Sequence, residues 1–140
     1  GTNGIQAMDL VGRKLADGGA AAEGLLAEMA ATVEAASAHE DMAQALAAAL
    51  SKLKGTTRWM LDASELNDRF AGATPYLRAW GQTLGAHYLL KGALADPTEE
   101  RLAVARFYIH QILPQMHAHA QAATAGAAPL YALDAEKLSA

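Results

Sequence analysis

Histidines, carboxylates and aromatic rings are the side chains of this 140-residue sequence that could do chemistry, and each group also has a structural interpretation. His110 and His117 are seven residues apart and would share one side of a helix, whereas His119 would lie off that side. Metal sites in helical bundles usually add inward carboxylates, often as Glu-x-x-His. The predicted helix around these histidines has no acidic residue after Glu100. We therefore expect solvated or hydrogen-bonded histidines and no metal site.

A second cluster, His39-Glu40-Asp41, has the residue types of an acid–base site but stands at a predicted helix boundary. Ser37 and Glu40 have the spacing of a capping box, in which side chains accept hydrogen bonds from free backbone N–H groups. The sequence has no cysteine, no Ser-His-Asp arrangement, no Walker loop and no GxGxxG motif. We expect this cluster to cap a helix, and we predict no catalytic residue in the chain.

Six aromatic residues on three predicted helices could line a ligand pocket, but core anchors are the favoured interpretation. A buried Trp or Tyr needs a partner for its polar hydrogen. Arg58, Arg78 and Arg106 are near these residues in the sequence and could stack on the rings or pair with carboxylates. The six are Trp59, Tyr76, Trp80, Tyr88, Phe107 and Tyr108.

The first fifteen residues run from small polar side chains into an apolar helical pattern. Asn3 is the predicted N-cap, and Gln6 is placed to complete a capping box. Such a helix start exposes N–H groups and a positive dipole end, which phosphate-bearing ligands favour. An ordinary capped helix is the alternative. The predicted apolar face consists of Ile5, Met8, Val11, Gly12 and Leu15.

Composition and periodicity predict an all-α fold. Alanine, the best helix former, supplies about a quarter of the residues, and there are only four prolines. We expect an antiparallel bundle of about four main helices, with a short N-terminal helix and a docked C-terminal tail. The first predicted helix is capped by Asn3 and ends near Ala16, and the second covers Ala21 to about Ala36. The third begins within residues 37–41 and reaches about Ala63, and the last two run from about Asp68 to Leu94 and from Glu99 to about Ala123.

Breaks between these helices follow from turn and cap residues. Asp17-Gly18-Gly19 should form a turn, and Asp96-Pro97-Thr98 should end one helix and cap the next. The break near Ser37 is either a turn or a kink between nearly continuous helices. Thr74-Pro75 either kinks a helix or starts one, and Pro114 should bend the last helix.

Two further features concern packing. Gly81, Gly85 and Ala86 form a strip of small residues that would let a neighbouring backbone approach closely. The helix over 40–63 carries an apolar seam at close to heptad spacing. The tail should dock Leu130, Tyr131 and Leu133 on the bundle.

Charge and hydropathy exclude some classes of partner. The net charge of -4 and the pI near 5.7 argue against nucleic-acid binding. The most apolar run, Ala79 to Ala95, is interrupted by Gln82, His87 and Lys91, so it predicts a core helix and not a membrane span. With no visible signal peptide, we expect a cytoplasmic protein.

Taken together, Gly1, Thr2, Ile5 and Gln6 resemble the C-terminal active-site segment of the flavin-dependent acyl-CoA dehydrogenases. In many members this segment reads Tyr-Glu-Gly-Thr, a few residues, then Ile-Gln, followed by an amphipathic helix. The remainder resembles the acetyl-CoA dehydrogenase-like C-terminal domain of the longer members, a group that includes methylthiopropionyl-CoA dehydrogenases. The matching stretches are residues 57–61, 73–78, 105–107 and 113–115.

The resemblance implies a flavoprotein oxidoreductase of fatty acid metabolism. The parent would remove the α-proton of an acyl-CoA thioester with a glutamate and pass the β-hydride to FAD. That glutamate would immediately precede Gly1, so we expect the chain to be a piece of a longer protein and inactive alone. The implied FAD-binding positions are Gly1, Thr2 and Asn3, although Gly4 replaces the Gln or Glu that reaches the adenine in many members.

The resemblance also implies a domain organisation. Residues 1–16 would end the catalytic core, and residues 17–140 would form the C-terminal bundle. Expected partners are the rest of the parent enzyme, its acyl-CoA substrate, an electron acceptor and further subunits in a homo-oligomer, with no nucleic acid and no membrane. The alternative is a stand-alone helical interaction module with no catalytic role.

Overall fold

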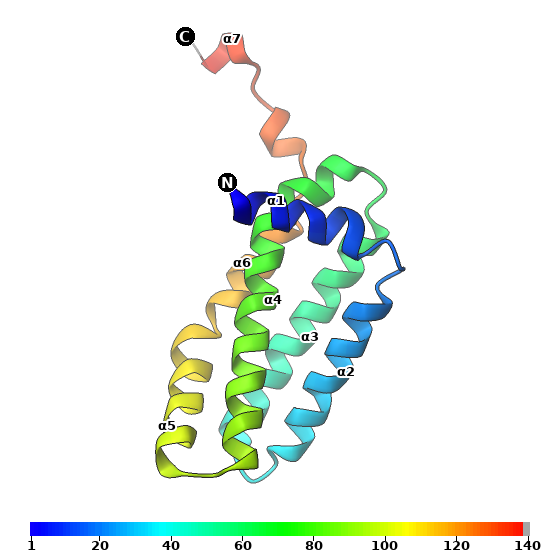
Figure 1. The fold of residues 1–140 in the computed structure, drawn as a ribbon. Coiled ribbons are helices and arrows are strands. Elements are labelled where there is room, and N and C mark those ends of the chain that lie inside the picture. Colours follow the sequence, from blue (N-terminus) through cyan, green and yellow to red (C-terminus); the bar gives the residue numbers. More distant parts are fainter. Residues whose placement is uncertain (139–140) are drawn as a thin grey trace.

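The computed structural model describes residues 1–138, and over these residues the chain is all-helical with no strand, as predicted. Three long helices and one interrupted rod lie side by side, and the first helical segment crosses one end of them (Figure 1). The long helices are α2 (Ala20–Ala35), α3 (Glu40–Asp62) and α4 (Leu66–Ala95). The interrupted rod consists of α5 (Glu99–Phe107), the π-helix η2 (Tyr108–Ile112) and α6 (Gln115–Ala123). The remaining elements are α1 (Thr2–Asp9), the π-helix η1 (Leu10–Lys14), the 3₁₀ turn η3 (Ala128–Tyr131) and α7 (Ala135–Leu138).

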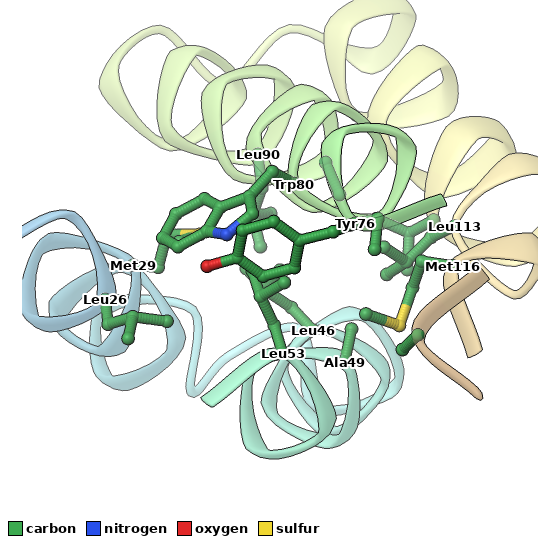
Figure 2. Packing of buried hydrophobic residues seen from close by; sticks show 14 of the residues in the cluster. Leu26, Met29, Leu46, Ala49, Leu53, Tyr76, Trp80, Leu90, Leu113 and Met116 are labelled. Atoms are coloured by element: carbon green, nitrogen blue, oxygen red, sulfur yellow. The ribbon is translucent and has the colours of Figure 1, made fainter. Parts of the chain in front are cut away.

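Helix α3 supplies the seam on which the bundle packs. Its buried positions recur every three or four residues, so one face of the helix is continuous with the core. Tyr76 and Trp80 of α4 and Met116 of α6 meet this face (Figure 2). The predicted seam is confirmed, and its buried members are Met42, Leu46, Ala49, Leu53, Thr57 and Met60.

Both prolines inside the helical rods are accommodated without ending them. Pro75 lies within α4, and the turns before it run at an angle to the rest of the helix (Figure 1). Helix α4 therefore kinks near Thr74-Pro75 and does not start there. Before Pro114, the Leu113 N–H donates to the Tyr108 carbonyl at 2.9 Å, five residues back. This wider π turn leaves room for the proline ring, which has no N–H and would clash with an α-helical carbonyl.

The predicted N-cap at Asn3 is wrong because the helix begins earlier. Gly1 occupies the cap position, and its carbonyl accepts hydrogen bonds from the N–H groups of Gly4 at 3.1 Å and Ile5 at 3.3 Å. Asn3 therefore lies inside the first turn, and no side chain caps α1. The exposed N–H end of the helix is kept, with Thr2 as its first residue.

The buried face of the first helical segment also differs from the prediction. Ala7, Val11 and Leu15 are buried, whereas Ile5 is 71% exposed and Met8 is 45% exposed. The three buried residues are four apart, so they form one ridge across α4. The small Ala7 side chain permits the close crossing that the larger Ile5 and Met8 would prevent.

Turns at the two ends of α2 have different outcomes. The predicted Asp17-Gly18-Gly19 turn is confirmed, with both glycines at positive φ and the Asp17 carboxylate accepting from the N–H groups of Gly19 at 2.8 Å and Ala21 at 3.0 Å. At the other end, α2 and α3 run antiparallel through a short turn, so the nearly continuous, kinked arrangement is excluded (Figure 1).

The predicted capping box between Ser37 and Glu40 is also wrong. His39 is the N-cap residue of α3 and contributes no side-chain hydrogen bond. The Glu40 carboxylate instead accepts from Gln44 Nε2 at 2.8 Å, one turn further along the helix.

Close approach of helix backbones occurs at Gly72 and not at the predicted strip. A Cβ at Gly72 would collide with the carbonyl oxygen of Ala123 in α6. At Gly85 the neighbour is the Tyr108 side chain, and nothing lies within 4 Å of a Cβ built at Gly81. Of the predicted strip only Ala86 is fully buried. Gly85 thus makes room for an aromatic side chain, and the tightest helix contact is between α4 and α6.

The C-terminal tail does not dock on the bundle. It extends beyond the end that carries α1, and Leu130, Tyr131 and Leu133 are between 55% and 70% exposed (Figure 1). The prediction that these side chains cover the bundle is therefore wrong. Among residues 1–138, no helix combines the length and the apolar character needed to cross a membrane.

Candidate functional site

The predicted cofactor-binding positions lie at the free end of α1. Gly1, Thr2 and Asn3 are all exposed. The first main-chain bond of the helix is donated by Gly4, so the N–H groups of Thr2 and Asn3 fall outside the helical ladder. This end carries a positive partial charge and open donors, which suit an oxygen of a phosphate group. None of the three residues lines either of the apolar grooves described below.

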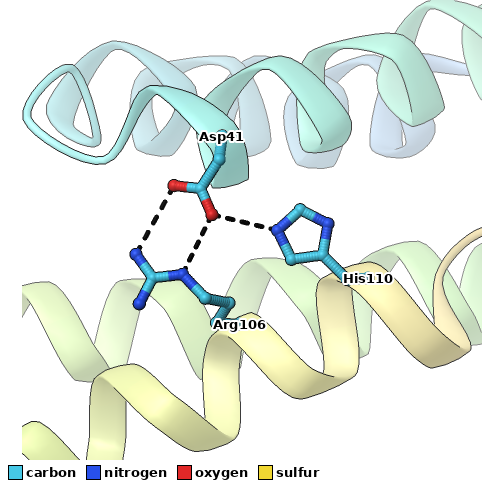
Figure 3. Close-up of polar contacts among 3 residues, drawn as sticks. All are labelled: Asp41, Arg106 and His110. Atoms are coloured by element: carbon cyan, nitrogen blue, oxygen red, sulfur yellow. Dashed lines mark hydrogen bonds and ion pairs between the residues drawn. The ribbon is translucent and has the colours of Figure 1, made fainter.

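Asp41 was expected to cap a helix, and the structure places it in an ion-pair cluster instead (Figure 3). Its carboxylate accepts from Arg106 Nε at 2.9 Å and from Arg106 Nη2 at 3.5 Å, and the same group lies 3.0 Å from His110 Nε2. The three side chains connect α3 to α5 and η2. The Arg106 guanidinium, followed by His110, holds the pKa of the Asp41 carboxyl well below its ordinary value.

This cluster is unsuited to acid–base catalysis. A general base works best when its pKa lies near the working pH, whereas the Asp41 carboxylate stays ionised far below neutrality. All three side chains are between 40% and 47% exposed, so the cluster lies on an open surface. Its role in this arrangement is to join two helices.

The remaining histidines form no metal site in the described part of the chain. His110 is engaged with Asp41, and His117 is exposed. Within residues 1–138, no three side chains among His, Cys, Asp and Glu are grouped closely enough to hold a metal ion.

His87 is a buried titratable residue that the sequence pattern did not single out. It lies in α4, and its Nε2 is 3.5 Å from Glu28 Oε1 of α2, while Lys91 Nζ approaches the same oxygen at 2.6 Å. Burial lowers the pKa of His87, and Glu28 opposes that shift. These contacts join α2 to α4. A histidine within the apolar run 79–95 was the available signal.

Four of the six aromatic residues pack in or against the core, as predicted: Tyr76 and Trp80 are buried in it, and Trp59 and Tyr108 are partly buried against it. Tyr76 is fully buried, and its hydroxyl forms a 2.9 Å hydrogen bond with Thr57 Oγ1. Trp80 meets the Tyr76 ring edge to face, with centroids 6.3 Å apart (Figure 2). The prediction is wrong for Tyr88 and Phe107, which are 53% and 63% exposed.

The arginines near these rings have separate outcomes. Arg58 pairs with Asp62 on α3 at 3.2 Å, and Arg106 pairs with Asp41. Arg78 is exposed on α4. The carboxylate alternative therefore holds for Arg58 and Arg106.

Two apolar grooves mark the surface of the bundle. One, of about 350 Å³, lies between the first helical segment, α2 and α4, and Leu25, Trp80 and Leu84 are among its walls. The other, of about 320 Å³, lies between α4 and α5. Neither groove is lined by a paired acid and base with a nucleophile, so the described chain offers packing surfaces and no assembled catalytic constellation.

Comparison with known families shows which protein family this bundle belongs to. Residues 25–134 match the family described as acetyl-CoA dehydrogenase C-terminal like. The chain belongs to this family. The match covers α3, α4, α5, η2, α6 and η3, together with most of α2. No curated protein and no solved structure matches the chain.

Membership in the acetyl-CoA dehydrogenase C-terminal-like family confirms the predicted relationship to the C-terminal region of acyl-CoA dehydrogenases. Domains of this family belong to larger oxidoreductases, and in this chain the domain is the all-helical bundle. The match begins at residue 25, so the predicted cofactor-binding residues lie outside it.

Proposed function

We propose that this chain is the C-terminal domain of an FAD-dependent acyl-CoA dehydrogenase of the methylthiopropionyl-CoA dehydrogenase-like subgroup. The parent enzyme oxidises the α,β-bond of an acyl-CoA thioester in the cytoplasm and passes the electrons to a separate acceptor. The family match over residues 25–134 carries this proposal. The bundle itself has a structural role. This role is supported by its core of packed apolar side chains and by the polar clusters that connect its helices.

In the proposed domain organisation, residues 1–16 and residues 17–140 have different roles. The first segment ends the catalytic core, and its Gly1, Thr2 and Asn3 form one edge of the flavin site. Support comes from the exposed N–H end of α1, which fits a phosphate oxygen of FAD. FAD would supply the hydride acceptor for the reaction. As the family resemblance implies, the glutamate that acts as base would immediately precede Gly1.

The first helical segment is also the proposed joint between the core and the bundle. On one side, Ala7 and Val11 are buried in the contact with α4. On the other, Ile5 and Met8 point large apolar side chains to the exterior. Apolar side chains that are exposed on one face of a helix commonly mark a contact with another domain. We assign Ile5 and Met8 to the contact with the catalytic core.

Flavin retention tests this proposal. The isolated chain, mixed with FAD and desalted, should elute without flavin absorbance because it holds only one edge of the site. In the parent enzyme, Thr2→Val should weaken FAD retention, while the control Glu23→Gln, an exposed change on α2, should leave it unchanged. Stable flavin in the isolated chain, or equal losses in both variants, would contradict the assignment.

A further inference from the structure

The groove of about 350 Å³ between the first helical segment, α2 and α4 is a hollow that the flavin proposal does not use. Sites for small molecules commonly have volumes of about 300–1,000 Å³ and mostly apolar walls. Leu15, Tyr76 and Trp80 are buried along this groove, and four partly buried leucines complete its walls. The groove therefore has the size and the surface of a site for a small aliphatic ligand. The four leucines are Leu10, Leu25, Leu77 and Leu84.

Small residues keep this space open where the three elements meet. Ala21 and Ala22 of α2 and Gly81 of α4 all line the groove. Nothing lies within 4 Å of a Cβ built at Gly81, so no neighbouring element fills the hollow at that point. The sequence predicts close approach of a neighbouring backbone at Gly81, and the structure has a cavity there instead. An aliphatic chain can lie against α4 at this position.

The charge at the groove selects the kind of ligand. Lys14 is the one charged residue among the described residues that line it, and its side chain is exposed. Within residues 1–138 the Lys14 ammonium group forms no salt bridge, because the nearby Asp9 is held by Arg13 at 2.6 Å. A cleft lined by one sign of charge attracts the opposite sign. The groove therefore favours an anion over a neutral or a cationic ligand.

The π turn η1 brings the charge and an apolar wall to the same groove. Leu10 and Lys14 are the first and last residues of this turn, and both line the groove. Turns of this kind are rare in proteins and occur frequently at functional sites. In this chain, η1 provides an apolar contact for the chain of a ligand and a cation for its charged end.

We propose that this groove binds an aliphatic carboxylate, with its hydrocarbon chain along the leucines and its carboxylate paired with Lys14. Removal of the chain from water supplies most of the affinity. The ion pair lies at the exposed edge of the groove, so it adds a smaller contribution and orients the ligand. The inference goes beyond the proposed flavin role and does not depend on it, because Gly1, Thr2 and Asn3 do not line the groove.

Titration of the ¹⁵N-labelled chain with octanoate, followed by two-dimensional amide NMR, tests the site. The amides of Lys14 and Gly81 and the indole N–H of Trp80 should shift and saturate, whereas the indole of Trp59 on α3, outside the groove, should not. Octan-1-ol has the same chain without the charge and should bind roughly threefold more weakly, the effect of one exposed ion pair. Octylammonium should bind more weakly still. No saturating shifts at the groove, or equal binding of octanoate and octylammonium, would overturn the proposal.

Two variants separate the contribution of the charge from that of the hollow. Lys14→Met keeps an apolar stem and should reduce octanoate binding to the level of octan-1-ol, while Lys52→Met, an exposed change on α3, should leave it unchanged. Gly81→Leu should fill the groove and abolish the saturating shifts. Its matched control is Gly92→Leu, at an equally open position of α4 outside this groove, which should bind as the original chain does. Circular dichroism melts should show that both leucine variants stay folded. Unchanged octanoate binding in Lys14→Met or in Gly81→Leu would overturn the proposal.

Discussion

Gly72 is the position at which a single added methyl group should do the most damage. It lies in α4 opposite the last turn of α6, and these two helices make the closest contact in the bundle. The Cβ of Gly72→Ala would collide with the Ala123 carbonyl oxygen and lie 2.9 Å from its carbon. It would also lie 2.8 Å from Met60 Cε. The methionine can rotate away, but the carbonyl can move only if α6 shifts.

The expected magnitude combines two opposing effects. Alanine is favoured over glycine within a helix by about 0.5–1 kcal/mol. Overpacking of a tight core costs about 1–3 kcal/mol, and a fixed main-chain neighbour places Gly72→Ala at the upper end of that range. The net loss of unfolding free energy should be about 2 kcal/mol, which would lower Tm by roughly 6–10 °C in a chain of this size.

Urea unfolding followed by circular dichroism measures this loss, and Gly55→Ala is the matched control. Gly55 is exposed within α3, and nothing lies within 4 Å of its Cβ position. That variant should gain about 0.5–1 kcal/mol from helix propensity alone. Gly85→Ala should cost less than Gly72→Ala, because its neighbour is the Tyr108 side chain and not a backbone atom. Equal or improved stability of Gly72→Ala would refute the close α4–α6 contact.

Three further predictions concern buried and paired polar groups. Thr57→Val should cost about 1–3 kcal/mol by leaving the Tyr76 hydroxyl unpaired, and Tyr76→Phe in the same chain should recover part of that loss in urea melts. The pKa of His87 is lowered by burial, so stability should fall as pH drops below about 6.5, where the unfolded chain takes up the proton first. His87→Leu should flatten this part of a Tm-against-pH curve, and a retained slope would exclude His87 as the source of the pH dependence. The pKa of Asp41 is also lowered, so the stabilisation from its ion pair should be present above about pH 4 and lost as pH falls further. Asp41→Asn should cost about 0.5–1 kcal/mol at neutral pH, because the pair is nearly half exposed. If the variant loses stability below about pH 4 as steeply as the original chain, the prediction is contradicted.

Helix α3 was predictable because it carries a periodic apolar face. The seam of α3 from Met42 to Met60 appears in the sequence as it does in the core. Prolines were harder to interpret, since Pro75 allowed both a kink and a new helix start. The wider π turn before Pro114 avoids the clash between the proline ring and an α-helical carbonyl. From the sequence, only a bend was predicted at this position.

Errors arose where several local solutions compete or where the contact is distant. Asn3 and Ser37 have good capping side chains, but neighbouring residues began the helices instead. Gly72 and Gly85 look alike in the sequence, and only the packed helices distinguish a backbone neighbour from a side-chain neighbour. The tail residue Leu130 is apolar, yet nothing in its local pattern specifies a surface for it to cover.

The polar clusters could not be predicted from the sequence, because their contacts join residues that are far apart in the chain. Asp41 and His110 are 69 residues apart, and their contact depends on how α3 packs against η2. Gly1 and Thr2 are proposed as cofactor-binding residues on the basis of the family resemblance, and the exposed helix start is compatible with that role. Local chemistry alone left two interpretations open, a phosphate-binding helix start and an ordinary capped helix.

We propose that this chain is the structural C-terminal domain of an acyl-CoA dehydrogenase, with the catalytic residues elsewhere in the parent. The most direct measurement is turnover of a panel of acyl-CoA thioesters with an artificial electron acceptor, by the parent enzyme and by the isolated chain. The parent should oxidise at least one thioester, and the isolated chain should oxidise none. Turnover by the isolated chain, or a flavin-loaded parent that oxidises no acyl-CoA, would contradict the claim.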